Sequence, residues 1–177
     1  MALVLRELDS VTRRYMLEEF EQEQAGQPYR SKLLTLRGQQ DFPGHMRSVI
    51  RDGDDDALAQ ALAREKYWMD DEKLRYGDRR KVNVHQASSR LARMEFDTWY
   101  IRGLARRLMD EGERICKVVQ AGDADWDPEC EKHDGLVTSP KRIYDGHRAR
   151  YWPKVDRSAF SIPSSPGCSH TIERVAS

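Results

Sequence analysis

The sequence predicts an α+β protein, mainly α, in which a helical bundle with a long central helix precedes a small β-rich module. Three observations lead to this expectation. Apolar residues recur at helical spacing up to Gly112, a β-branched run follows, and glycine and proline then become frequent while helical spacing stops. We therefore expect a helical domain over residues 1–112 and a β/loop module with a Cys/His knuckle over residues 113–177.

Three helices are expected in the first part of the chain. The first is capped by Asp9 or Ser10 and has apolar side chains along one face. The second begins at Pro43, because the first position of a helix tolerates the missing N–H of proline. The third follows the acidic run 54–56, whose carboxylates suit the positive end of a helix dipole; we interpret this run as helix capping in preference to a metal site.

The longest helix is expected over residues 83–110. Its apolar positions follow a three-four spacing, and extra aromatic residues widen the apolar surface, so the helix should be central. The pair Trp99 and Tyr100 could form a stacking platform for a base, but its helical spacing favours core packing. The charged stretch 69–82 before this helix suggests a loop or a solvent-facing hairpin.

A strand is expected over residues 114–120, with Cys116 as a small buried apolar residue. The 30 basic side chains equal the 30 acidic ones, so the composition gives no sign of a global basic face for nucleic acid. No apolar run approaches the roughly 20 residues that span a bilayer, and the N-terminus has no signal-peptide core. We expect a protein of the host cytoplasm or of a virion, outside any membrane.

Two short Cys/His pairs carry the most specific pattern in the C-terminal module. Cys130 and His133 are separated by two residues, and Cys168 and His170 by one. A tight turn can direct the first pair to one point, and alternate residues of a strand share a face, so both pairs could converge on one ion. Two thiolates and two imidazoles form a tetrahedral zinc set with no open position for catalytic water. The predicted site is therefore structural zinc.

Two other interpretations of these residues stay open. The four side chains could lie among loops without metal, with the thiols reduced. Alternatively, Cys130 and Cys168 could form a disulfide, although three cysteines and no secretory signal make a disulfide framework an unexpected feature. A metal would supply folding energy that so small a module cannot obtain from its core.

The segment Tyr144–Pro153 mixes arginine with aromatic residues. This composition can bind nucleic acid or a partner protein. The candidate contacts are the nearby Arg142 and, within the segment, Arg148, Arg150, Tyr151 and Trp152. The alternative is a surface turn whose arginines cover the aromatic rings. A nucleic-acid-binding module with a zinc knuckle is thus a second functional hypothesis.

A third hypothesis is a metal-dependent hydrolase or nuclease that uses His133, Asp134, Asp145 and His147. The sequence contains no nucleophile elbow, P-loop, His-Glu-x-x-His or complete nuclease signature. We therefore expect a protein that is not an enzyme.

The order Cys130, His133, Gly135 and later Cys168 and His170 resembles the closing segment of bacteriophage Mu F-like minor head proteins. That family's tail reads Cys-x-x-Cys, then a glycine, and later a proline-rich stretch ending in a His/Cys cluster. His133 stands where the family has its second cysteine, the last cluster is shorter, and the family's long N-terminal domain has no counterpart.

The whole chain also resembles small proteins of actinobacterial phages and prophages, through the segments Phe96–Leu104 and Tyr144–Pro153. Together the resemblances imply a non-catalytic structural protein for head morphogenesis. Its expected partners are further copies of the chain, as a homo-oligomer, or the head and portal proteins of a capsid.

Overall fold

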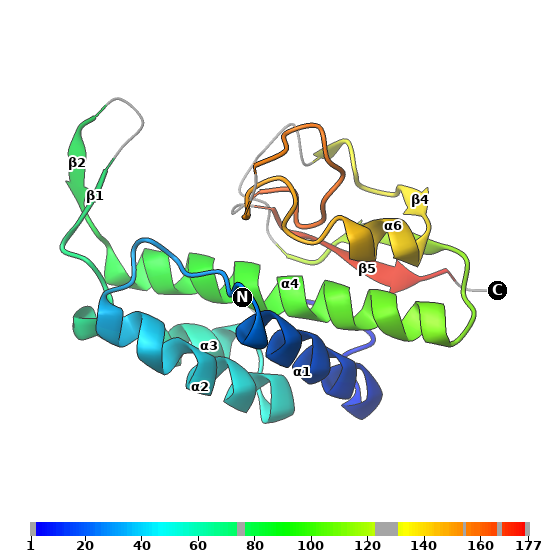
Figure 1. Ribbon diagram of the computed structural model, residues 1–177, viewed down its shortest axis with the longest axis horizontal. Helices are drawn as coiled ribbons and strands as arrows, with labels where there is room; N and C mark the ends of the chain where they lie inside the picture. The colour runs from blue at the N-terminus through cyan, green and yellow to red at the C-terminus, as the bar shows by residue number, and fades with distance from the viewer. Residues whose placement is uncertain (1–2, 74–76, 123–130, 154, 166–167, 176–177) are drawn as a thin grey trace.

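Helix α4 (Val84–Asp110) is the central element of the computed structural model, and the rest of the chain is arranged along it (Figure 1). The structure describes residues 3–73, 77–122, 131–153, 155–165 and 168–175. The side chain of Asn83 caps α4 by accepting a hydrogen bond from the backbone N–H of Gln86. Trp99 and Tyr100 are fully buried. The predicted long central helix and the core role of its aromatic pair are both confirmed.

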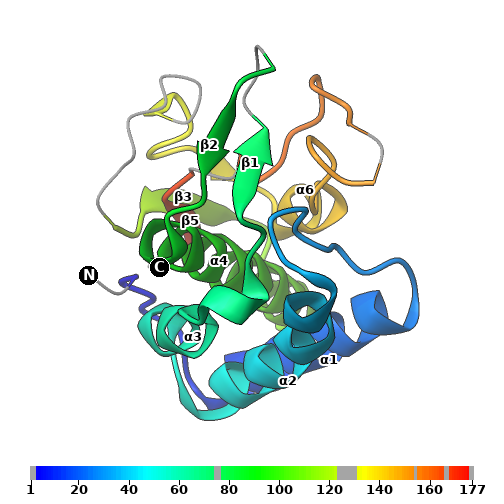
Figure 2. The same cartoon turned by 90° about the vertical axis from the view of Figure 1, so that its left-hand side faces the viewer.

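The N-terminal helices lie together on one side of α4 (Figures 1 and 2). They are α1 (Ser10–Ala25), α2 (Leu36–Asp52) and α3 (Asp55–Leu62), followed by a turn of 3₁₀ helix, η1 (Glu65–Tyr67). Asp9 caps α1 and Asp54 caps α3, each by accepting a backbone N–H of the first turn. The predicted capping roles of these acidic residues are therefore confirmed.

Helix α2 begins at Leu36, so the predicted start at Pro43 is wrong. The hydroxyl of Thr35 accepts the backbone N–H of Gly38 at 3.2 Å and provides the true N-cap. Phe42 is buried in the core, which favours helix before the proline. Pro43 then lies inside the helix. Packing of the first turns outweighs the one backbone hydrogen bond that the proline cannot make.

The described parts of the charged stretch, residues 69–73 and 77–82, contain the two strands of the predicted solvent-facing hairpin. Strand β1 (Asp71–Lys73) pairs antiparallel with β2 (Arg79–Lys81), and this pair stands away from the helices as an arm (Figures 1 and 2). The base of the arm is anchored, because Trp68 and Val82 are both buried in the core.

The C-terminal part of the chain lies on the other side of α4 from α1 and α2 (Figure 1). Its elements are β3 (Cys116–Gln120), β4 (Val137–Thr138), α6 (Pro140–Asp145) and β5 (His170–Arg174). The three strands form an antiparallel sheet in the order β4–β3–β5. Cys116 is fully buried, as predicted. These elements complete the predicted α+β, mainly α architecture.

One hydrophobic core spans the predicted boundary at residue 112. It includes Phe20 and Trp99 from the helical part together with Val118 and Ile172 from the sheet. The rings of Phe20 and Trp99 meet edge to face with centroids 5.2 Å apart. The C-terminal elements therefore share apolar packing with the helices.

A close approach of helices α1 and α4 depends on Gly103. A Cβ atom at this position would lie 2.7 Å from the backbone nitrogen of Met16. Only glycine allows the two helix backbones to come this near.

No helix in the described ranges is long and apolar enough to cross a lipid bilayer. The expected location, host cytoplasm or virion, stays a prediction.

Candidate functional site

The C-terminal sheet brings the turn of His133 and the segment of Cys168 and His170 to the same end of β3. His170 begins β5 and is paired with Gln120, the last residue of β3. On the other side of β3, Gly135 donates its backbone N–H to the carbonyl of Val118 at 2.9 Å. Gly135 has φ +75°, a conformation that favours glycine, and it closes the turn that carries His133. Residues more than 30 positions apart in the sequence are thus neighbours across one strand.

Cys168 and His170 form a close, buried pair. The Sγ atom of Cys168 lies 3.8 Å from Nδ1 of His170, and each residue is only 4% exposed. The hydrogen bond with Cys168 raises the pKa of His170, and the negative charge of Asp134 adds to the effect. Asp134 belongs to the turn that carries His133, so the charge of that turn acts on the Cys168–His170 pair.

His133 is largely buried, and its ring meets Phe160 edge to face with centroids 5.6 Å apart. Cys130, the fourth predicted zinc ligand, lies outside the described residues. Within the described ranges, no group of three or more His, Cys, Asp or Glu side chains is arranged to hold a metal ion. The soft thiol and the imidazole of the Cys168–His170 pair are the donor types that zinc prefers. The four-ligand zinc site stays a prediction.

Arg148, a predicted nucleic-acid or partner contact, is instead buried inside the molecule. Its guanidinium makes two parallel hydrogen bonds to the carboxylate of Glu95, at 2.9 and 2.7 Å, and a third to Glu23 at 3.0 Å. The side chains of Arg148 and Glu95 are 1% and 2% exposed. A guanidinium held in this way by two carboxylates is not available at the surface for a phosphate.

Aromatic rings enclose the same guanidinium. Its central carbon lies 4.7 Å from the ring centroid of Tyr29 and 5.3 Å from that of Trp99. Burial alone would lower the pKa of Arg148, but the negative charge of Glu95 outweighs it and raises the pKa well above its usual value. The backbone of Arg148 has φ +53°, a conformation that costs an L-residue energy. The surrounding ion pairs hold the residue in it.

His147 extends this buried cluster. Its Nε2 atom lies 2.9 Å from a carboxylate oxygen of Glu23. Burial lowers the pKa of His147 to about 4, so the ring is neutral at pH 7 and donates Nε2–H to Glu23. For Glu23, the hydrogen bond from His147 and the charge of Arg148 outweigh burial and lower the pKa to about 2. The negative charge of Glu23 is therefore paired with the positive charge of Arg148 inside the molecule.

A second buried carboxylate ties the C-terminal part to α1 and α4. Glu19 of α1 is fully buried and accepts hydrogen bonds from Arg102 at 2.5 Å and from Arg106 at 2.9 Å. The hydroxyl of Tyr144 donates to the same carboxylate at 3.1 Å. The guanidinium of Arg102 also lies 4.0 Å above the ring of Tyr144. Segment 144–151 is thus clamped to the helical part at two carboxylate centres.

The two aromatic residues of the predicted binding set, Tyr151 and Trp152, face the N-terminal half of the chain. Tyr151 and Trp152 pack edge to face on Tyr29, with centroids 6.2 and 5.8 Å apart. The indole N–H of Trp152 points to the carbonyl of Gln27 at 3.4 Å. Arg150 is half-buried. The structure brings Arg148, Tyr151 and Trp152 together, but as an internal contact between distant parts of the chain.

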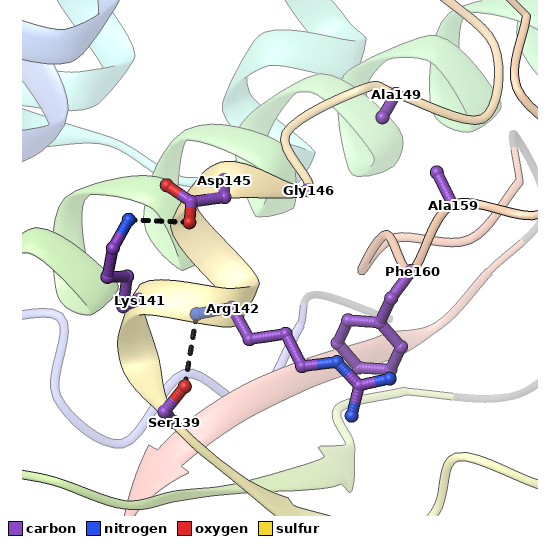
Figure 3. Close-up of a pocket in the computed structure, with 8 residues that line it drawn as sticks. All are labelled: Ser139, Lys141, Arg142, Asp145, Gly146, Ala149, Ala159 and Phe160. Atoms are coloured by element: carbon purple, nitrogen blue, oxygen red, sulfur yellow. Dashed lines mark hydrogen bonds and ion pairs between the residues drawn. The ribbon is translucent and has the colours of Figure 1, made fainter.

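Arg142 is the exposed member of the predicted set and lines a hollow between α6 and residues 159–160 (Figure 3). Its guanidinium lies 4.2 Å above the ring of Phe160. The hollow has a volume of about 460 Å³, and its lining also includes Lys141 and Asp145, which form an ion pair of 2.6 Å. The lining therefore combines polar, charged and apolar residues, with the cation of Arg142 stacked on an aromatic ring.

Three of the four residues of the hydrolase hypothesis, His133, Asp145 and His147, contact different partners in the structure. Asp145 forms an ion pair with Lys141 at the exposed end of α6, whereas His147 faces Glu23 in the interior. His133 packs on Phe160. The side chains are therefore directed to different partners.

The buried Glu19, Glu95 and Asp97 and the partly buried Glu23 escaped the sequence analysis. Glu95 lies between Met94 and Phe96 on the widely apolar helix α4, and Asp97 follows directly, so acidic residues inside an apolar sector were the available signal. Among the described residues, no partner meets full hydrogen-bond geometry at either carboxylate oxygen of Asp97, and the hydroxyl of Thr171 is the nearby donor that partly offsets burial. Burial raises the pKa of Asp97 well above its usual value.

No protein-family model, curated protein or solved structure matches the chain.

Proposed function

We propose that this chain is a non-catalytic interaction protein that takes part in assembly, and that it acts in a phage or prophage head as a minor, capsid-associated component. The helical part and the C-terminal part would form one rigid body that presents surfaces to other copies or to head and portal proteins. The resemblance of the Cys/His pattern to minor head proteins supplies the head context of this proposal.

The observation that carries the proposal is that Arg148, in the segment Tyr144–Pro153, forms its ion pairs inside the molecule. Arg148 lies between Glu95 and Glu23, so its charge serves the joint between the two parts of the chain. Such a joint fixes the relative position of the helices and the C-terminal elements. A fixed body with a projecting charged hairpin is suited to assembly with protein partners.

A structural zinc ion would add to the rigidity of the C-terminal part. Cys168 and His170 already lie within hydrogen-bond range of each other, and the turn of His133 lies across β3 from them. Zinc held by these three residues and Cys130 would fix the turn to β5, with no water position for hydrolysis. The zinc content of purified protein, measured for the natural chain and for Cys168→Ala, tests this part.

Co-migration with heads tests the assembly function. Cells that produce phage heads together with the tagged chain are lysed, and the lysate is separated on a density gradient. We expect the chain in the head fractions, and we expect the Asp145→Asn variant, altered at an exposed ion pair, to migrate in the same way. A folded chain that stays entirely at the top of the gradient would contradict the proposal.

The nucleic-acid module is the second candidate, and the exposed Arg142 beside Phe160 is the observation that favours it. Phosphate contacts would make binding fall steeply with salt. A gel-shift titration at low and high salt compares the natural chain with Arg142→Gln. A salt-sensitive shift that the substitution weakens would support this candidate, and no shift at low salt would exclude it.

A further inference from the structure

We propose that the β1–β2 hairpin is a self-association arm, and that the free edge of β2 in one copy binds the free edge of β1 in a second copy. This inference rests on the proposed assembly function and names the partner as another copy of the same chain. The pairing would be antiparallel and head to tail, so that each copy uses both edges of its hairpin.

The first support is the exposure of both edges of the arm. The sheet consists of β1 and β2 alone within the described residues, so each strand has one edge without a strand partner there. An exposed edge presents backbone N–H and C=O groups that can pair with a strand of another molecule. Both views show the arm standing away from the helical body (Figures 1 and 2).

The second support is that the described strands of the arm pack mainly on each other. All three residues of β2 are exposed, and the extensive contacts of β1 and β2 are with each other. An isolated two-stranded hairpin is only marginally stable in water. Here the buried residues Trp68 and Val82 hold its base, so its edges are presented in a fixed direction.

The third support is charge complementarity, which the hairpin itself displays. Within one chain, Asp71 is paired with Lys81 and Glu72 with Arg80, and the Nε atom of Arg80 donates to Glu72 at 2.8 Å. The free edge of β2 in one copy can take β1 of a second copy in this same register. The same two opposite-charge pairs would then recur between copies.

Pairing of like strands is less favourable. Two β2 strands would place Arg79, Arg80 and Lys81 against the same three cations. Two β1 strands aligned about their centres would place Glu72 against Glu72 of the other copy and leave the basic edge of β2 unused. Head-to-tail contacts are heterologous, so they build rings or open chains in place of closed dimers.

A charge-swap experiment tests this pairing without breaking the hairpin. In the swap variant, Asp71→Lys is combined with Lys81→Asp, and Glu72→Arg with Arg80→Glu. Each pair inside the hairpin is kept with its sign reversed. Natural and swap chains are labelled with donor and acceptor dyes, and energy transfer between chains is measured at low salt over a range of concentrations.

We expect natural chains to associate with natural chains, and swap chains with swap chains. Transfer between natural and swap chains should be about tenfold lower, because two favourable cross-strand pairs become repulsive, each change altering affinity by a factor of a few. Pairing of β1 with β1 or of β2 with β2 predicts the opposite, namely stronger transfer in the mixed sample. Like-with-like sorting therefore supports the head-to-tail arrangement, and preferential mixing would overturn it.

Two further outcomes would also overturn the inference. One is the absence of transfer among natural chains at every concentration, and the other is transfer that arises only when duplex DNA is added. If the natural chain nevertheless migrates with heads, the hairpin inference alone fails. If the chains sort as expected but never migrate with heads, the proposed function fails and the self-association arm stands.

Discussion

Replacement of Arg148 by methionine should destabilise the protein strongly. The substitution keeps much of the side-chain volume but removes the cation between Glu95 and Glu23. The buried Glu95, whose side chain is only 2% exposed, and the partly buried Glu23 would then lose their main counter-charge. Loss of one partner from a buried pair costs about 3–5 kcal/mol, a large part of the roughly 5–15 kcal/mol that stabilises a typical domain.

Urea unfolding followed by circular dichroism measures this loss. The neighbouring Arg150→Met provides the control, because Arg150 is only half-buried and should change the free energy of unfolding by no more than about 0.5 kcal/mol. Combining Arg148→Met with Glu95→Leu removes the charge left behind at Glu95. The double variant should recover most of the stability, since an apolar pair can replace a buried ion pair.

Two results would refute this reasoning. A loss below about 1 kcal/mol for Arg148→Met would be typical of an exposed ion pair and not of a buried one. Additive effects of the two substitutions would mean that Arg148 and Glu95 do not interact in the folded protein.

Three other perturbations follow from the same structure. Gly103→Ala should lower the free energy of unfolding by about 1–3 kcal/mol, because the added Cβ would meet Met16. Gly44→Ala in α2, where a Cβ would have nothing within 4 Å, should raise it by about 1 kcal/mol. Equal effects of the two substitutions in urea unfolding would be inconsistent with the helix contact. Because the pKa of Asp97 is raised in the folded protein, its contribution to stability falls as the pH rises above about 4. The Asp97→Asn variant should therefore be more stable than the natural chain at pH 7 but not at pH 4. Because the pKa of His147 is lowered to about 4, stability should fall by up to about 3 kcal/mol as the pH drops from 6.5 to 4. In unfolding experiments across this range, the stability of the His147→Gln variant should depend less on pH.

Local features of the fold were predictable because they depend on neighbouring residues. The spacing of apolar side chains was sufficient for α4, and the acidic caps Asp9 and Asp54 marked the starts of α1 and α3. The start of α2 was missed because the proline signal at Pro43 was local, whereas the burial of Phe42 depends on contacts with distant elements.

The candidate site was less predictable for the same reason. Arg148 was predicted as a contact to nucleic acid or a partner because aromatic side chains lie beside it, but its partners Glu23 and Glu95 come from helices α1 and α4. Whether an arginine faces solvent or a buried carboxylate is decided by tertiary packing. In contrast, the closeness of Cys168 and His170 follows from their spacing of two positions in the sequence, although only His170 belongs to β5.

Sedimentation velocity with purified components tests the proposed assembly function most directly. The natural chain, confirmed as folded by its circular dichroism, is mixed with isolated phage heads, and its distribution is followed by a fluorescent label. We expect a fraction of the label to sediment with the heads and to increase with head concentration until it saturates. Label that sediments only as free chain at every head concentration would contradict the account.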